Sequence, residues 1–258
     1  MQRAYLAGLI AGAACPLIGT FLVLRRLALI AEGLGHAAFA GAAAGLLLHV
    51  HPLVSTVAVS LMGALGIERL RATRRAAGDV AIAIYASLGL GVGMALAKLA
   101  GRINTDLLGV LFGSLVAVQP ADLMMIAALG AAVMVTVLAL YRQLLSITID
   151  EDTARSAGIP VDALNQILVL LTALTVVLAM RVVGLLLVTS LMVLPVATSL
   201  QWARGLGWAL VGAVGLGMAS TSIGLTVAYA ADLPAGAAIV LTSVGLFLAS
   251  LVLSPRRR

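Results

Sequence analysis

The sequence is poor in the residues from which soluble active sites and disulfide frameworks are built. Among 258 residues it has one cysteine, three histidines, 4% aromatic residues and 10% charged residues. Cys15 alone excludes a disulfide or a cysteine metal cluster within one chain. The single lysine, Lys98, lies between Ala97 and Leu99. The Gly-Lys-Ser/Thr core of a P-loop is therefore missing, which excludes ATP hydrolysis by that mechanism.

What is abundant is apolar sequence. Hydrophobic residues make up 62% of the chain and the mean hydropathy is +1.17, whereas soluble domains carry about 25% charged residues. Apolar runs of about twenty residues predict an all-α, polytopic integral membrane bundle that forms one domain over residues 1–258, because a β-barrel shows short alternating segments instead. We expect about nine transmembrane helices, within a range of eight to ten: Ala4 to Leu24, Gly33 to Leu48, Leu53 to Ile67, Val80 to Leu99, Ala121 to Tyr141, Asn165 to Met180, Gly184 to Leu200, Trp208 to Tyr229 and Ala235 to Leu253.

The range depends on the short segments. Leu107 to Val118 is too short to cross straight and is interpreted as re-entrant or interfacial. If it crosses, the count is ten. If Asn165 to Leu200 does not cross twice, the count is eight. The first apolar run continues to Leu24, which favours a retained span over a cleaved signal.

The basic residues predict the orientation in the membrane. Assigning the segments around Arg25, Arg71, Arg155, Arg204 and Arg257 to the cytoplasm places twelve basic residues on that side and leaves four on the other. Cytoplasmic loops carry an excess of Arg and Lys. We therefore expect the carboxyl terminus inside and, with nine spans, the amino terminus outside. Because the net charge of +6 lies in clusters at span ends, it favours membrane orientation and no nucleic-acid partner.

Glu32 and His36 are the chemically most informative pair. They are four residues apart, so both project from one face of a helix. At about 1.5 Å per residue, Glu32 lies roughly 9 Å and His36 roughly 15 Å deeper than Arg26, which brings His36 near the bilayer midplane. Ionisable groups at that depth mark transport pathways by default. The alternative is a Glu–His hydrogen bond that only locks helices together.

Small residues recur on the same helix, at Gly33, Ala37, Gly41 and Gly45. Such a stripe lets another helix approach closely. It predicts helix packing, either within the chain or at a tightly packed seam that contains the polar pair.

Carboxylate and imidazole at this spacing suit a metal ion. Zinc takes about four ligands from His, Glu or Asp, and carboxylate oxygens also suit manganese. Two ligands are too few, so the site needs further residues or a symmetry mate that doubles the pair.

Five ordered segments resemble the permeases of zinc, manganese and iron ABC importers. The first, LVLRRLALIAEGLGHAAFAG (22–41), is similar to a motif in which two basic residues precede an acidic-Gly-x-Ser-His-Ala segment. The others are DLLGVLFGSLVAV (106–118), IDEDTARSAGIPV (149–161), RVVGLLLVTSLMVLPVAT (181–198) and DLPAGAAIVL (232–241). This chain has Glu32 where Asp is usual and Gly35 where Ser is usual.

The resemblance implies a homodimeric permease of the bacterial cytoplasmic membrane, with two cytoplasmic ATP-binding subunits and an extracytoplasmic metal-binding protein. It implies that Glu32 and His36 line the path of a divalent metal, for which we favour Zn²⁺ over manganese or iron, with no tightly bound cofactor. It also implies a coupling helix for the ATPase at about 150–160. Its spacing of polar residues predicts a short helix capped near Asp150 and ended by Gly158, and its candidate contact residues are Asp150, Glu151, Ala154, Arg155, Gly158 and Pro160.

Other functions stay open on the residues alone. A secondary transporter would use Glu32 and His36 as a proton relay. An intramembrane protease would need a nucleophile such as Ser114 or Ser190, but HExxH and Gly-x-Ser-x-Gly motifs are missing. His49 and His51 form an HxH that is interpreted as surface histidines or as an entry site for metal.

Overall fold

The computed structural model describes residues 2–72, 78–100, 113 and 120–253. Within them the regular elements are all helices. They are α1 (Gln2–Leu24), α2 (Leu29–Leu47), α3 (Pro52–Ala72), α4 (Gly78–Leu99), α6 (Pro120–Ala139), α7 (Tyr141–Ile149), α8 (Glu151–Ser156), α9 (Val161–Val183), the 3₁₀ turn η1 (Leu185–Leu187), α10 (Val188–Trp202), α11 (Leu206–Ala231) and α12 (Ala235–Leu253).

Eight of these helices are long and apolar enough to cross a membrane, and α10 is a shorter apolar helix among the described residues. With α10 they correspond to the nine predicted spans. Gly184 ends α9 with φ +88°, a positive value that glycine adopts without a side-chain penalty. The 3₁₀ turn η1 follows directly. The all-α, multi-pass prediction is confirmed. The predicted segment Leu107 to Val118 lies outside the described residues except for Gly113.

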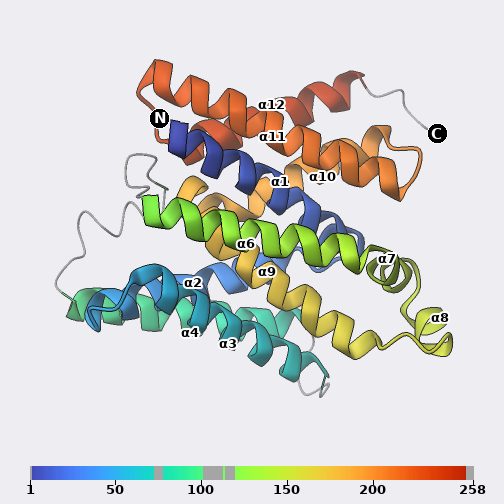
Figure 1. Cartoon of the computed structure of the whole chain (residues 1–258), viewed down its shortest axis with the longest axis horizontal. Helices are drawn as coiled ribbons and strands as arrows, with labels where there is room; N and C mark the ends of the chain where they lie inside the picture. The colour runs from blue at the N-terminus through green and yellow to red at the C-terminus, as the bar shows by residue number, and fades with distance from the viewer. Residues whose placement is uncertain (1, 73–77, 101–112, 114–119, 254–258) are drawn as a thin grey trace.

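The helices pack in three tiers (Figure 1). α11 and α12 lie at one edge, α1, α6, α9 and α10 form the middle, and α2, α3 and α4 lie at the other edge. α9 joins the tiers, because it contacts α1, α2, α3 and α6. Buried side chains from α1, α2, α9 and α10 make up most of the apolar core. The candidate residues Glu32 and His36 of α2 are thereby held on a well-packed helix.

Several boundaries differ from the sequence prediction. α2 begins at Leu29, not Gly33, so Glu32 lies within its first turn. The predicted span to Tyr141 ends at Ala139, and α7 follows as a separate helix that buries Leu144 and Ile147. Hydropathy overlooked α7 because it is amphipathic rather than apolar all round.

The small-residue stripe of α2 packs within the chain. A Cβ added at Gly33 would lie 2.9 Å from the Ile82 Cγ2 of α4, and one at Gly41 would lie 2.7 Å from the Cα of Thr56 in α3. Gly45 meets Pro52 and Ser55 of α3, and Ala37 faces Gly63. This geometry fits the intrachain interpretation, because α3 and α4 already occupy the stripe.

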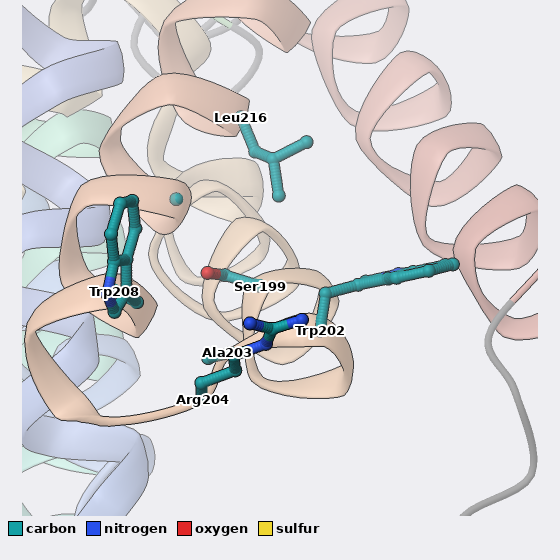
Figure 2. A pocket seen from close by; sticks show the side chains of 7 residues that line it. Ser199, Trp202, Ala203, Arg204, Trp208 and Leu216 are labelled. Atoms are coloured by element: carbon teal, nitrogen blue, oxygen red, sulfur yellow. The ribbon is translucent and has the colours of Figure 1, made fainter.

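Where the structure describes them, the segments that the basic residues assigned to the cytoplasm meet at one end of the bundle; residues 73–77 and 254–258 lie outside the described part. Arg25 after α1 lies close to Glu68 and Arg71 of α3 and bonds to Glu151 of α8. The turn from α10 into α11 lies at the same end, where Gly207 approaches the hydroxyl of Tyr141. This turn is bounded by Trp202 and Trp208 (Figure 2).

Candidate functional site

Glu32 and His36 line one small cavity together with Leu185 and Thr189. Its volume is about 110 Å³. One wall comes from α2 and the other from η1 and the first turn of α10. The predicted pair therefore faces a common space, and the break between α9 and α10 supplies the opposite side of that space.

His36 presents an imidazole nitrogen that has no internal partner. The side chain is half-buried, and its Nδ1 atom is buried without a hydrogen bond to any residue that the structure describes. Buried polar atoms of this kind usually have a partner, so an orphaned one needs an explanation. Glu32 therefore does not form a helix-locking hydrogen bond with the Nδ1 atom of His36. Glu32 is exposed, and its carboxylate is open to a ligand.

The backbone of α2 is held closely at His36. A Cβ added at Gly89 of α4 would lie 2.6 Å from the carbonyl carbon and oxygen of His36. Glycine at 89 therefore lets α4 pack directly on the turn that carries the imidazole. This contact fixes the position of His36 relative to the rest of the bundle.

Sequence reasoning did not identify Leu185 and Thr189. Thr189 is a polar residue in the lining of the cavity, and the signal for it was a polar residue within an apolar run after Gly184. Gly35 accommodates this wall, since a Cβ there would lie 2.9 Å from the Leu185 Cδ1. Gly35, which replaces the usual Ser of the motif, thus lies where the Leu185 side chain packs closely against α2.

One chain does not complete a metal site. No group of three or more His, Cys, Asp or Glu side chains that could hold a metal occurs among the described residues. His49 and His51 are exposed in the turn between α2 and α3, and thirteen residues separate His36 from His49, which is about 20 Å along the helix. The structure does not bring these histidines to the Glu32–His36 cavity.

The segment predicted to be a capped helix is α8. Asp150 is its N-cap, and the Oδ1 atom of Asp150 accepts hydrogen bonds from the backbone N–H groups of Asp152 at 3.0 Å and Thr153 at 3.1 Å. The hydroxyl of Thr153 also donates to Asp150. These bonds, led by the one from the Thr153 hydroxyl, hold the pKa of Asp150 below its ordinary value. The cap fixes the start of α8 although the helix is short.

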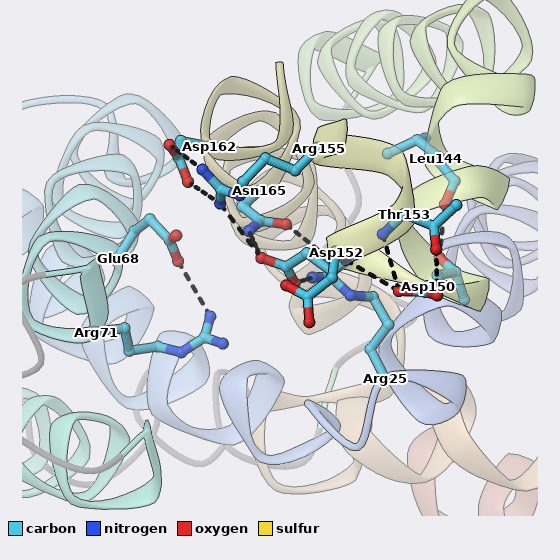
Figure 3. A network of polar contacts seen from close by, with 12 residues as sticks. Arg25, Glu68, Arg71, Leu144, Asp150, Asp152, Thr153, Arg155, Asp162 and Asn165 are labelled. Carbon is cyan, nitrogen blue, oxygen red and sulfur yellow. Dashed lines mark hydrogen bonds and ion pairs between the residues drawn. The ribbon is translucent and has the colours of Figure 1, made fainter. Parts of the chain in front are cut away.

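Two arginines tie α8 to the transmembrane helices (Figure 3). The guanidinium of Arg25 donates to Glu151 Oε2 at 2.7 Å and to Asn165 Oδ1 at 2.7 Å. Burial lowers the pKa of Arg25, and the charge of Glu151 opposes that effect. Arg155 forms a two-pronged pair with Asp162 of α9 at 2.8 and 3.1 Å, and this bond raises its pKa.

The end of α8 is set by backbone geometry. Gly158 has φ +81°, and the N–H of Ile159 donates to the carbonyl of Ala154, which is the Schellman arrangement at a helix end. Ala154 is buried, and Pro160 stands at the N-cap of α9. The six predicted contact residues therefore lie in one short segment, from the N-cap of α8 to the N-cap of α9, at the end of the bundle.

Comparisons with known proteins agree over almost the whole chain. Residues 1–254 match the model of the ABC 3 transport family. The high-affinity zinc uptake system membrane protein ZnuB of Haemophilus influenzae is 32% identical over 252 residues, covering 96% of this chain and 95% of that protein. The manganese import system permease protein ScaB of Streptococcus parasanguinis is 30% identical over 258 residues, covering 100% and 92%.

A solved structure agrees as well. PsaBC from Streptococcus pneumoniae in complex with Fab matches with a TM-score of 0.90 and 30% identity over 100% of this chain and 92% of that chain. These findings confirm the resemblance that the sequence motifs indicated. The chain belongs to the ABC 3 transport family, and it is a multi-pass permease of the bacterial inner membrane.

Proposed function

We propose that this chain moves a divalent transition metal across the cytoplasmic membrane, and that Glu32 and His36 bind the metal in transit. One observation carries the proposal: Glu32 and His36 line the same small cavity, and the buried Nδ1 atom of His36 has no hydrogen-bond partner among the described residues. Imidazole nitrogen and carboxylate oxygen are the donors that zinc and manganese take from proteins. The zinc and manganese importers named among the relatives support this class of cargo.

The working unit that we propose is a two-fold dimer. One chain offers two ligands, and the described residues hold no larger cluster, whereas a tetrahedral zinc ion needs about four. A symmetry mate supplies a second carboxylate and a second imidazole. Mass measurement in a mild membrane mimetic should find two copies of this chain with two ATPase subunits. A transport-active complex with one permease copy would overturn this arrangement.

The energy source in this proposal is a partner ATPase that docks on α8. The chain lacks a P-loop, and α8 is a polar element that is bonded to α1 through Arg25 and to α9 through Arg155. A displacement of α8 by the ATPase would therefore be transmitted directly to the two core helices α1 and α9. α9 leads to η1, which lines the metal cavity. An extracytoplasmic binding protein would deliver the metal from the other side.

The test is metal uptake by vesicles that contain the permease, its ATPase and its binding protein. Glu32→Gln and His36→Ala should each reduce uptake more than about tenfold, because each removes a ligand from both copies. Asp79→Asn is the matched control for the loss of a carboxylate, since Asp79 is exposed and does not line the cavity, and it should transport normally. Unchanged uptake in both cavity variants would show that the path lies elsewhere.

Zinc is the preferred cargo in this proposal, and manganese is the second candidate. Two imidazoles and two carboxylates match tetrahedral zinc. Thr189 lines the same cavity, and a Thr189 hydroxyl on the metal would favour manganese, because it would add one oxygen ligand from each copy. Uptake of both metals by Thr189→Val separates the two. If the hydroxyl is a ligand, this variant loses manganese transport and keeps zinc transport. Glu32→Asp, which shortens the carboxylate reach, should keep transport and alter the ratio of the two metals.

A further inference from the structure

A second, larger cavity lies where α10 turns into α11, away from the Glu32–His36 site. Its volume is about 520 Å³, and it is lined by Ser199, Trp202, Ala203, Arg204, Trp208, Gly212 and Leu216. Figure 2 shows the guanidinium of Arg204 between the two indole rings at one end of this space, with Leu216 at the opposite end. None of these residues lines the Glu32–His36 cavity.

The cavity is polar at one end and apolar at the other. Arg204 is exposed in the loop, and it makes no ion pair with a described residue. Trp208, Gly212 and Leu216 follow at intervals of four along one face of α11, which is about 12 Å of helix. The groove therefore runs from a positive charge at the end of the span into its apolar length.

The walls at the charged end are built from tryptophan. The indole N–H of Trp202 donates to the hydroxyl of Ser250 in α12 at 2.7 Å, which fixes that ring. The side of Trp208 is open, since the residue is 73% exposed. Tryptophan is the residue that prefers the level of lipid headgroups, with an apolar ring and a polar N–H. Gly212 lets α11 pack closely against Ser199 of α10 beneath the groove, because a Cβ at this position would collide with the Ser199 side chain.

We propose that this groove binds one anionic phospholipid of the cytoplasmic leaflet. The phosphate lies on Arg204 between the two tryptophans, and an acyl chain lies along Trp208, Gly212 and Leu216. The polarity of the groove runs in the same direction as that of a lipid in the inner leaflet, with charge at the membrane surface and hydrocarbon below. An arginine near that leaflet attracts anionic headgroups.

The sequence supplies its own probe for this site. Trp202 and Trp208 are its only two tryptophans, so the tryptophan fluorescence of the full-length chain reports on this groove alone. The experiment reconstitutes the chain in phosphatidylcholine vesicles that contain increasing fractions of brominated phosphatidylglycerol or brominated phosphatidylcholine. Bromine quenches an indole that it contacts.

The expected result is a preference of about fivefold for the anionic lipid, which corresponds to one arginine near a charged headgroup. Arg204→Gln should bring the two quenching curves together. The control Arg69→Gln removes an exposed arginine from the last turn of α3 at the same end of the bundle, and it should keep the preference. Raising the salt concentration should weaken the preference in the unaltered chain, because salt screens exposed charges.

Two outcomes would overturn the proposal. Equal quenching by both lipids in the unaltered chain would show that Arg204 does not select a headgroup. Absence of quenching by either lipid would show that protein, such as a second copy of the chain, covers this face. Circular dichroism of each variant checks that its helix content is unchanged, so a lost preference is assigned to the site and not to unfolding.

Discussion

The Nη2 atom of Arg25 lies 2.7 Å from the Oε2 atom of Glu151. This ion pair joins the end of the first transmembrane helix to the short helix that follows 126 residues later in the sequence. The arginine side chain is only 9% exposed, whereas the glutamate is 41% exposed. Arg25 is therefore the fixed member of the pair, and α8 is the element that it holds in place.

Replacing Arg25 with glutamine should loosen α8 and uncouple ATP hydrolysis from metal movement. The variant loses the bonds to Glu151 and Asn165, at a cost of about 1–2 kcal/mol in the free energy of unfolding. Thermal unfolding and the ratio of metal moved to ATP hydrolysed measure the two effects. Arg26→Gln is the matched control, because Arg26 is exposed next in the chain. The prediction is wrong if Arg25→Gln and Arg26→Gln couple equally well.

Gly158 should tolerate asparagine but not valine. A Cβ at this position meets no atom within 4 Å, so bulk is not the constraint, but φ is +81°. A β-branched residue there costs roughly 1–2 kcal/mol, and asparagine adopts this conformation more readily. We expect Gly158→Val to displace the end of α8 and to lower ATPase-coupled transport. Ala154→Leu should act similarly, because Ala154 is buried. Full coupling in both variants would count against α8 as the ATPase contact.

The cap at Asp150 should make the stability of α8 depend on pH. Hydrogen bonds to the carboxylate lower the pKa of Asp150 in the folded state. Its contribution is therefore present above the ordinary pKa of aspartate and is lost as the pH falls through the lower folded value. Asp150→Asn keeps an acceptor for the two backbone N–H groups but does not titrate. The difference in unfolding temperature between the two proteins should shrink towards acid pH. A constant difference would refute the charged cap.

Gly89→Ala should impair metal transport, and Gly91→Ala should not. The added methyl at 89 would overlap the backbone of His36, at a cost of about 1–3 kcal/mol for overpacking. It would also shift the imidazole that faces the cavity. At 91 nothing lies within 4 Å, and alanine gains up to about 1 kcal/mol of helix propensity. Uptake and unfolding measurements on both variants provide the comparison, and equal behaviour would show that this contact does not position His36.

The sequence by itself determined the class of the protein and the central pair. Long apolar runs predict spanning helices, because backbone polar groups must be satisfied by hydrogen bonds within the membrane. Each of the eight long helices coincides with such a run. Helical spacing placed Glu32 and His36 on one face, because the period of a helix is local. The cap at Asp150 and the end at Gly158 were also predicted, since both depend on residues within one turn. Predicted boundaries differed from the observed ones by several residues, because polar residues such as Asp162 occur within the first turn of α9.

Tertiary structure alone decided which residues face one another across long stretches of chain. Thr189 lies more than 150 residues after Glu32, and only the break at Gly184 brings it to the same cavity. The partners of Arg25 and the use of the α2 stripe by α3 and α4 were likewise not predictable from spacing. The groove between Trp202 and Trp208 depends on the turn between two helices. Local periodicity fixes the face of a helix, but the helix that meets that face is chosen by the packing of the whole bundle.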